Sequence, residues 1–350
     1  MLAIASGLML RDLIDSCTPR DRLVNRARVE AVVNPLGTSE VSGEVARATI
    51  AHALNVALYA DLLERVPSGA GYVDQQVATG NPIILDHGAV RTVAWPTASE
   101  VPAGSEQVAR VLEPLGYSRR ETYPLTKLSM TGYSYAHDDD AEGLAQWFVS
   151  EFHPDGFSDS FQHAVERTIS TGREPIGPAA TQLLDRLSTE RSLPLADAMA
   201  LLPVLFKCFT RLHLEPLDSD HELLRAESAE MAWIATEGTA FNHATDRVVD
   251  VAATAEGERG AGRPIKDAVE VSGSGRVLQT AHVATPVDRS FRTAEGTRTT
   301  NTVPGSFFEF IERRQLPDSA ELDLAFDASN AQGIFKMTAP ALTPEPKGHH

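Results

Sequence analysis

Two side chains suited to specific chemistry, His87 and Arg91, lie four residues apart in the stretch 86–93. The β-branched residues of this stretch and the apolar lead-in at 82–85 predict a buried or half-buried strand. Because alternate residues of a strand share a face, both side chains point the same way. A neutral imidazole can bind a metal ion, and a guanidinium can hold a carboxylate through two hydrogen bonds. This pairing would suit a small organic acid, although a satisfied, partly buried His and Arg is the commoner meaning of such a stretch taken alone.

Two further candidate metal ligands, His243 and Glu309, lie in strand-like segments much later in the chain. Glu309 stands among the apolar residues of the segment 307–311, where a carboxylate is costly unless it is paired or bound to a metal. A core ion pair with an arginine is the alternative explanation. Together with His87, these residues provide the two imidazoles and one carboxylate of mononuclear non-haem Fe(II) oxygenases. That ligand set leaves coordination positions open for substrate and dioxygen.

The elements that must position these side chains follow from the hydrophobic pattern. We expect two β regions, each preceded by helices, and a glycine-rich segment at 254–275 that is either a variable insertion or a mobile loop. The expected organisation is an N-terminal helical segment at 1–66, a first β module at 67–157, a helical insertion at 158–238, a second β module at 239–340 and a disordered tail at 341–350.

Composition limits the class of protein. The 350 residues are 42% hydrophobic and 23% charged, which predicts a globular chain with a full core. A formal net charge of −17 argues against a nucleic-acid or anionic-membrane partner. Two cysteines exclude a disulfide framework, and no apolar run approaches the roughly 20 residues of a membrane span. The apolar N-terminus lacks the basic region of a secretory signal, so we expect a cytoplasmic protein.

Several short segments, taken in order, resemble the DUF1338 family. Its characterised members are 2-oxoadipate dioxygenase/decarboxylases, also called 2-hydroxyglutarate synthases. The family is similar to the vicinal-oxygen-chelate superfamily, which implies an α+β fold whose mixed β-sheet core is built from two βαβββ-type modules, here with an added helical region. The resemblance extends over roughly residues 50–338 and is carried by residues 87–92, 148–151, 241–243, 304–310 and 331–336.

The resemblance also implies roles for individual residues. His87, His243 and Glu309 would hold Fe(II), and Arg91 would be the catalytic residue that binds a substrate carboxylate. Further substrate or neighbouring contacts would come from Lys127, Asn242 and Gln332.

The activity implied by the resemblance is an oxygen-dependent decarboxylation of a small 2-oxo acid, converting 2-oxoadipate to 2-hydroxyglutarate and CO2. The chain departs from the family pattern in its length, in a mixture of features from the compact and long forms, and in the segment 254–275. These departures leave the substrate open. The alternatives are a different 2-oxo or amino acid on the same iron scaffold, a metal-dependent isomerase or lyase without redox chemistry, and a non-catalytic binding protein. The oligomeric state is not predicted.

Overall fold

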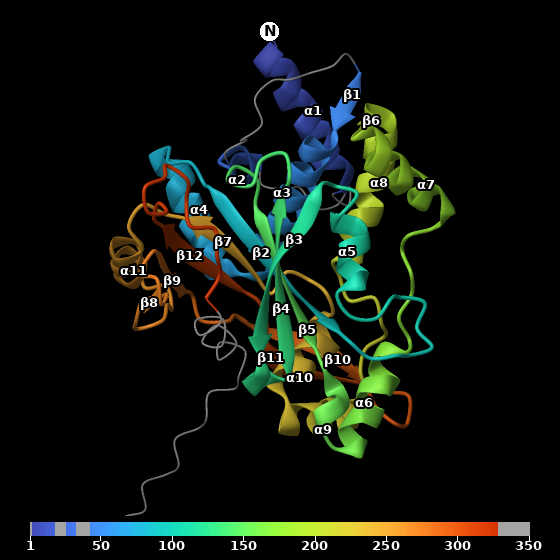
Figure 1. The fold of residues 1–350 in the computed structure, drawn as a ribbon. Helices are drawn as coiled ribbons and strands as arrows, with labels where there is room; N and C mark the ends of the chain where they lie inside the picture. The colour runs from blue at the N-terminus through green and yellow to red at the C-terminus, as the bar shows by residue number, and fades with distance from the viewer. Residues whose placement is uncertain (1, 18–25, 33–42, 328–350) are drawn as a thin grey trace, which may run out of the picture.

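The computed structural model describes residues 2–17, 26–32 and 43–327. Within these ranges the chain forms helices that surround a large sheet (Figure 1). The helices are α1 (Leu2–Cys17), α2 (Arg26–Glu30), α3 (Arg47–Arg65), α4 (Pro67–Thr79), α5 (Glu106–Leu112), α6 (Asp159–Ile169), α7 (Pro178–Glu190), α8 (Leu195–Cys208), α9 (Asp218–Glu227), α10 (Ala229–Glu237) and α11 (Val251–Gly260).

The central sheet has eight strands in the order β3-β4-β5-β2-β7-β12-β9-β8. These strands are β2 (Leu85–Val93), β3 (Tyr117–Leu125), β4 (Met130–His137), β5 (Gln146–Phe152), β7 (His243–Arg247), β8 (Glu270–Val271), β9 (Val277–Ala281) and β12 (Phe307–Arg313). Two separate pairs join β1 (Glu44–Ala46) to β6 (Ser192–Pro194) and β10 (Pro286–Arg292) to β11 (Arg298–Pro304).

The sheet consists of two modules with the same connectivity. In the first, β2 is followed by α5 and then by β3, β4 and β5, with β5 returning to lie parallel to β2. In the second, β7 is followed by α11 and then by β8, β9 and β12, with β12 parallel to β7. The β10–β11 hairpin is an insertion before the last strand of the second module. The antiparallel pairing of β2 with β7 joins the modules, which confirms the predicted fold of two βαβββ modules.

Strand alternation places the two larger clusters of buried side chains on opposite faces of the sheet. Val90 of β2 and Trp147 of β5 belong to the larger cluster, which includes residues of α1, α3, α4 and α8. Ala89 and Phe148 belong to the other cluster, together with residues of α6, α9 and α10. We call the face that carries Ala89 and Phe148 the inner face. His87 and Arg91 lie on the inner face, because they alternate with Val90.

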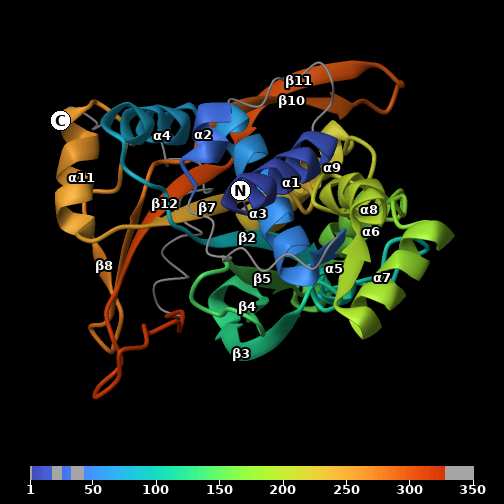
Figure 2. The same ribbon diagram turned by 90° about the horizontal axis from the view of Figure 1, so that it is seen from above.

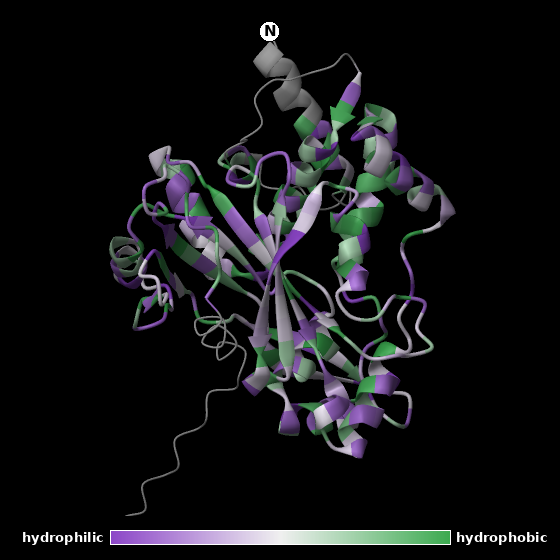
Figure 3. Ribbon diagram, viewed as in Figure 1, coloured by the Kyte–Doolittle hydropathy of each residue, from purple (hydrophilic) through white to green (hydrophobic). Residues whose placement is uncertain are grey.

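The helices occupy different ends of the molecule. Figure 1 shows α1 and α3 at the top and α6, α9 and α10 at the bottom, and Figure 2 places α11 beside β8 at one edge of the sheet, with β3 and β4 at the other. Hydrophobic residues are concentrated in α8, whereas α6 and α9 carry more hydrophilic ones (Figure 3). No helix in the described ranges is both long and apolar enough to cross a membrane.

Several predicted elements are confirmed, and one needs correction. The strand predicted at 86–93 is β2, and helical structure is present in the N-terminal and 158–238 segments. The segment 254–275 is not simply a loop, because its first part belongs to α11, which packs against β9 and β12. The predicted domain boundaries remain a prediction. The predicted tail at 341–350 lies outside the described residues.

Candidate metal centre

His87, His243 and Glu309 come together at the centre of the inner face. Thr245 of β7 is the cross-strand neighbour of His87 on β2 and of Glu309 on β12, so these residues form one row across three strands. His243 lies two residues before Thr245 and therefore projects from the same face. All three candidate ligands are buried, and their ligand atoms lie within 4.8 Å of one another. The pairing register of the two modules thus brings together residues from distant parts of the sequence.

The ligand atoms converge on one point. Nε2 of His243 lies 3.1 Å from Oε2 of Glu309 and 3.4 Å from Nε2 of His87. Nε2 of His87 lies 3.6 Å from the same carboxylate oxygen. Ligands bound about 2.1 Å from one ion lie about 3.0 to 3.4 Å apart in octahedral or tetrahedral geometry. The cluster therefore fits a single divalent ion with little rearrangement.

The second carboxylate oxygen of Glu309 supports this fit. Oε1 is buried and has no hydrogen-bond partner in the described part of the chain, and the side chain is 1% exposed. An unpartnered buried carboxylate oxygen is costly, so such atoms mark sites that bind something further. Thr245 donates a hydrogen bond from Oγ1 to Oε2 of Glu309 at 3.1 Å, which helps to fix the carboxylate.

A buried carboxylate, Asp86, orients the imidazole of His87. Nδ1 of His87 lies 2.8 Å from Oδ1 of Asp86, so Nε2 is left to face the other two ligands. Asp86 in turn accepts hydrogen bonds from the guanidinium groups of Arg313 and Arg247, the closest of each at 2.9 Å. A carboxylate behind a ligating histidine fixes the tautomer and ring direction and strengthens the ligand.

The charges around the cluster favour a cation. Burial raises the pKa of Glu309, but His243 and His87 outweigh burial and hold this pKa well below its usual value. Burial lowers the pKa of His243, which keeps this imidazole neutral and able to bind a metal. Burial also acts to lower the pKa of His87, but the carboxylates of Asp86 and Glu309 outweigh it and raise this pKa. Without a metal the cluster therefore attracts a proton, whose place a divalent cation can take.

The approximate symmetry of the two modules accounts for a set of three candidate ligands rather than four. An approximate twofold axis through the Gly88–Ala244 pair would exchange His87 with His243, given the observed registers. The same axis would exchange Glu309 with Phe148, which cannot bind a metal. The first module therefore supplies one candidate ligand and the second supplies two, a set that would leave part of a metal's coordination sphere to other molecules.

Arg91 lies on the same face as His87, as predicted, and is fully buried. Its Nη1 is 3.0 Å from Oε2 of Glu230, and its guanidinium carbon is 4.6 Å from the centre of the Trp233 ring. Both partners belong to α10. Burial raises the pKa of Glu230, and Arg91 opposes that rise. The arginine is thus held on the inner face between a carboxylate and an aromatic ring of α10, four residues along β2 from His87.

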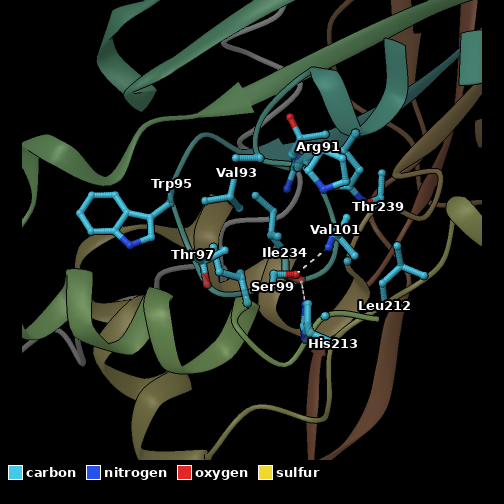
Figure 4. A pocket seen from close by; sticks show the side chains of 17 residues that line it. Arg91, Val93, Trp95, Thr97, Ser99, Val101, Leu212, His213, Ile234 and Thr239 are labelled. Carbon is cyan, nitrogen blue, oxygen red and sulfur yellow. Dashed lines mark hydrogen bonds between the residues drawn. The ribbon is translucent and has the colours of Figure 1, made fainter. Parts of the chain in front are cut away.

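Two features border this site. Phe326 packs edge-on against His87 with ring centres 4.9 Å apart, and its ring is 5.0 Å from that of Phe148, so it shields the imidazole on one side. A partly open pocket adjoins Arg91 at the end of β2 (Figure 4). Figure 4 shows Val93, Ile234 and Leu212 among the apolar residues that line this pocket. The arginine therefore shares the strand face of the candidate metal ligands and also lines a pocket of apolar and polar residues.

The remaining predicted contacts are placed differently. Asn242 is buried next to His243; its backbone joins β2 to β12 through Ala89 and Phe307, and its Oδ1 has no hydrogen-bond partner among the residues described. Lys127 is exposed on a short 3-10 helix, η1 (Thr126–Leu128), between β3 and β4. Gln332 and the rest of the predicted segment 331–336 lie outside the described residues. The roles proposed for these three residues remain predictions.

Several residues around the site could hardly be anticipated from the sequence. Asp86 adjoins His87 in the chain, but a strand would normally direct it to the opposite face. Glu230 and Trp233 lie in a region predicted only as helical. Gln146 is the cross-strand neighbour of His87 on β5; it is buried, and its Nε2 has no hydrogen-bond partner in the described structure. The one sequence feature that could have pointed to these residues is the presence of polar side chains within otherwise apolar segments.

Comparisons with known proteins identify the family of the chain. The family described as 2-oxoadipate dioxygenase/decarboxylase matches residues 50–336. Among solved structures, a putative glyoxalase superfamily protein from Ralstonia eutropha JMP134 is 47% identical with a TM-score of 0.86, over 91% of this chain and 98% of that one. No curated protein matches the chain significantly.

Two hydroxyglutarate synthases solved in complex with 2-oxoadipate share the fold. The one from Oryza sativa is 21% identical with a TM-score of 0.63, over 87% of this chain and 98% of that one. The one from Pseudomonas putida is 17% identical with a TM-score of 0.59, over 85% of this chain and 74% of that one. Because the family match spans most of the sequence, this chain belongs to the 2-oxoadipate dioxygenase/decarboxylase family.

Proposed function

We propose that this protein is an Fe(II)-dependent dioxygenase/decarboxylase that converts 2-oxoadipate and O2 to 2-hydroxyglutarate and CO2. One observation carries the proposal: His87, His243 and Glu309 form a buried cluster of two imidazoles and a carboxylate in a chain of this family. The relatives that were solved with 2-oxoadipate support the choice of substrate. Bound Fe(II) would supply the binding and activation of dioxygen and of the 2-oxo acid.

The protein's own residues would orient the reactants and exclude water. Arg91 would bind the distal carboxylate of the substrate, because a guanidinium matches a carboxylate with two parallel hydrogen bonds. The distance along β2 from His87 to Arg91 would then select for the length of the acid. Phe148 and Phe326 would form an apolar wall beside the metal ligands, which limits the access of water to the reacting carbon.

The decisive experiment is oxygen uptake by protein that is purified anaerobically, stripped of metal and reloaded with Fe(II). With 2-oxoadipate we expect one CO2 and one 2-hydroxyglutarate for each O2 consumed, measured by an oxygen electrode and mass spectrometry. Reloading with Zn(II) should give no oxygen uptake, because zinc has no redox chemistry.

Two variants make the experiment specific. His243→Ala should abolish turnover and iron binding, because it removes one of the three ligands. His163→Ala, at an exposed position on α6, should keep both. Iron binding without turnover of 2-oxoadipate would move the search to other 2-oxo or amino acids. Turnover of 2-oxoadipate without oxygen consumption would rule out a dioxygenase.

A further inference from the structure

The Arg91 guanidinium already has a carboxylate partner within the protein. Oε2 of Glu230 lies 3.0 Å from Nη1 of Arg91. Glu230 is 5% exposed and Arg91 is fully buried, so both charges are largely removed from water. Trp233 lies one turn beyond Glu230 on α10 and covers the guanidinium with its ring at 4.6 Å. A carboxylate of the protein therefore already lies at the place proposed for the distal carboxylate of the substrate.

A second carboxylate changes this balance. When a dicarboxylic acid binds, two negative groups share one guanidinium in surroundings where charges are weakly screened. Like charges a few ångströms apart repel strongly in such surroundings, because little water lies between them to screen the repulsion. The incoming carboxylate must therefore compete with Glu230 for the cation.

The contact between Glu230 and Arg91 is suited to such competition. Oε2 of Glu230 forms the ion pair but has no hydrogen-bond partner in the described chain, so the attraction is mainly Coulombic. A second ion pair of α10 is different: the buried Glu237 accepts two hydrogen bonds, at 2.7 Å each, from the partly exposed Arg289. Such a two-bond pair holds its partners in place. The looser pair lies on the inner face, four residues from the metal ligand His87.

We propose that Glu230 is an internal counter-ion that competes with the distal carboxylate of the substrate for Arg91, and that it sets the affinity of the site for dicarboxylic 2-oxo acids. This inference rests on the proposed function, in which Arg91 binds that carboxylate. A counter-ion has a clear advantage in the free protein, because a buried arginine without a partner is strongly destabilising. Glu230 would thus stabilise the substrate-free protein and weaken substrate binding. Such a trade-off between stability and function is common at binding sites.

The test compares the wild-type holoenzyme with Glu230→Gln, which keeps the shape of the side chain and removes its charge. The substrates are 2-oxoadipate and 2-oxohexanoate, which has the same length and lacks the distal carboxylate. We expect KM for 2-oxoadipate to fall at least about tenfold and KM for 2-oxohexanoate to change less than about twofold. The melting temperature without substrate should fall.

Glu237→Gln is the matched control, because it neutralises another buried glutamate of the same helix whose partner is Arg289. It should lower the melting temperature and leave the ratio of the two KM values unchanged. If Glu230→Gln changed the KM values for both substrates by the same factor, the effect would be a general structural one and the inference would be overturned. A rise in KM for 2-oxoadipate alone would show that Glu230 orients Arg91, which also overturns it.

A binding measurement separates this inference from the proposed reaction. Adipate carries two carboxylates and no 2-oxo group, and hexanoate carries one carboxylate. Adipate should raise the melting temperature of Glu230→Gln more than that of the wild type, whereas hexanoate should affect both equally. If 2-oxoadipate is not turned over but adipate behaves in this way, the proposed reaction fails and the role of Glu230 stands. Equal shifts with adipate would refute the counter-ion role, whatever the reaction is.

Discussion

Nδ1 of His87 lies 2.8 Å from Oδ1 of Asp86, the residue immediately before it in the chain. Neighbouring residues in a regular strand point to opposite faces, so this contact is unusual. It coincides with a register shift between β2 and β7 at Leu85 and His87. Such irregularities bend a strand and redirect its side chains, and they occur often beside active sites. The local irregularity thus allows adjacent residues to serve as a ligand and as its orienting carboxylate.

Asp86→Asn should weaken metal binding by about 10- to 100-fold, because the orienting charge behind His87 is lost. The free energy of unfolding should also fall, by about 3–5 kcal/mol, since the buried Arg313 loses a charged partner. Metal affinity is measured by anaerobic competition with a chelator on protein that circular dichroism shows to be folded. Asp220→Asn is the control, because it breaks an ion pair with Arg167 on α6 and α9. Unchanged metal affinity in folded Asp86→Asn would contradict this role.

Metal binding should stabilise the folded protein, because the ligand cluster forms only in that state. At a free metal concentration of 100 times Kd the gain is about 2.7 kcal/mol, measurable as a rise in melting temperature. Glu309→Gln should remove most of this rise. Glu258→Gln should retain it, because that buried carboxylate pairs with His282 and Arg263 instead. A chelator-insensitive melting temperature in metal-loaded wild-type protein would argue against the site.

The dependence of stability on pH should include a contribution from Asp246. Burial raises the pKa of Asp246 to about 7, even though the side chain accepts hydrogen bonds from Tyr72 and from the amide of Ile84. The folded protein therefore binds this proton more tightly than the unfolded chain does. Stability from this group is greatest at low pH and declines as the pH rises from about 4 to about 7, by at most about 1.4 kcal/mol per pH unit.

Asp246→Asn isolates that contribution. The free energy of unfolding of both proteins is measured in urea at several pH values. As the pH rises to about 7, the wild type should lose stability relative to the variant, and above that pH the difference should stay constant. A difference that does not vary between pH 5 and pH 7 would mean that Asp246 titrates normally.

Gly88→Ala should destabilise the protein and weaken metal binding. A Cβ atom at this position would lie 2.3 Å from the ring of Phe241, which packs against Trp147 with ring centres 5.0 Å apart. Overpacking of this kind costs about 1–3 kcal/mol and would displace the strand that carries His87. Gly257→Ala is the control, since open space surrounds that exposed position in α11. It should raise stability by about 0.5–1 kcal/mol. Equal effects of the two substitutions would exclude the packing explanation.

The sequence by itself determined the chemical types and the local geometry of the candidate site. Strand periodicity placed His87 and Arg91 on one face, and the apolar surroundings of Glu309 indicated a buried carboxylate with a special partner. The ordered segments of the family resemblance then selected His243 from the 11 histidines of the chain. These inferences needed only the local spacing of residue types and the order of short segments along the chain, both of which the sequence carries directly.

Only the tertiary structure decided which distant residues support these groups. Pairing of β2, β7 and β12 brought the ligands together and placed Arg313 against Asp86, 227 positions away in the chain. Packing of α10 on the inner face brought Glu230 to Arg91. Such contacts depend on strand register and helix packing between distant segments. Local propensity leaves both undetermined, because a shift of one residue in register would turn every side chain of a strand to the other face.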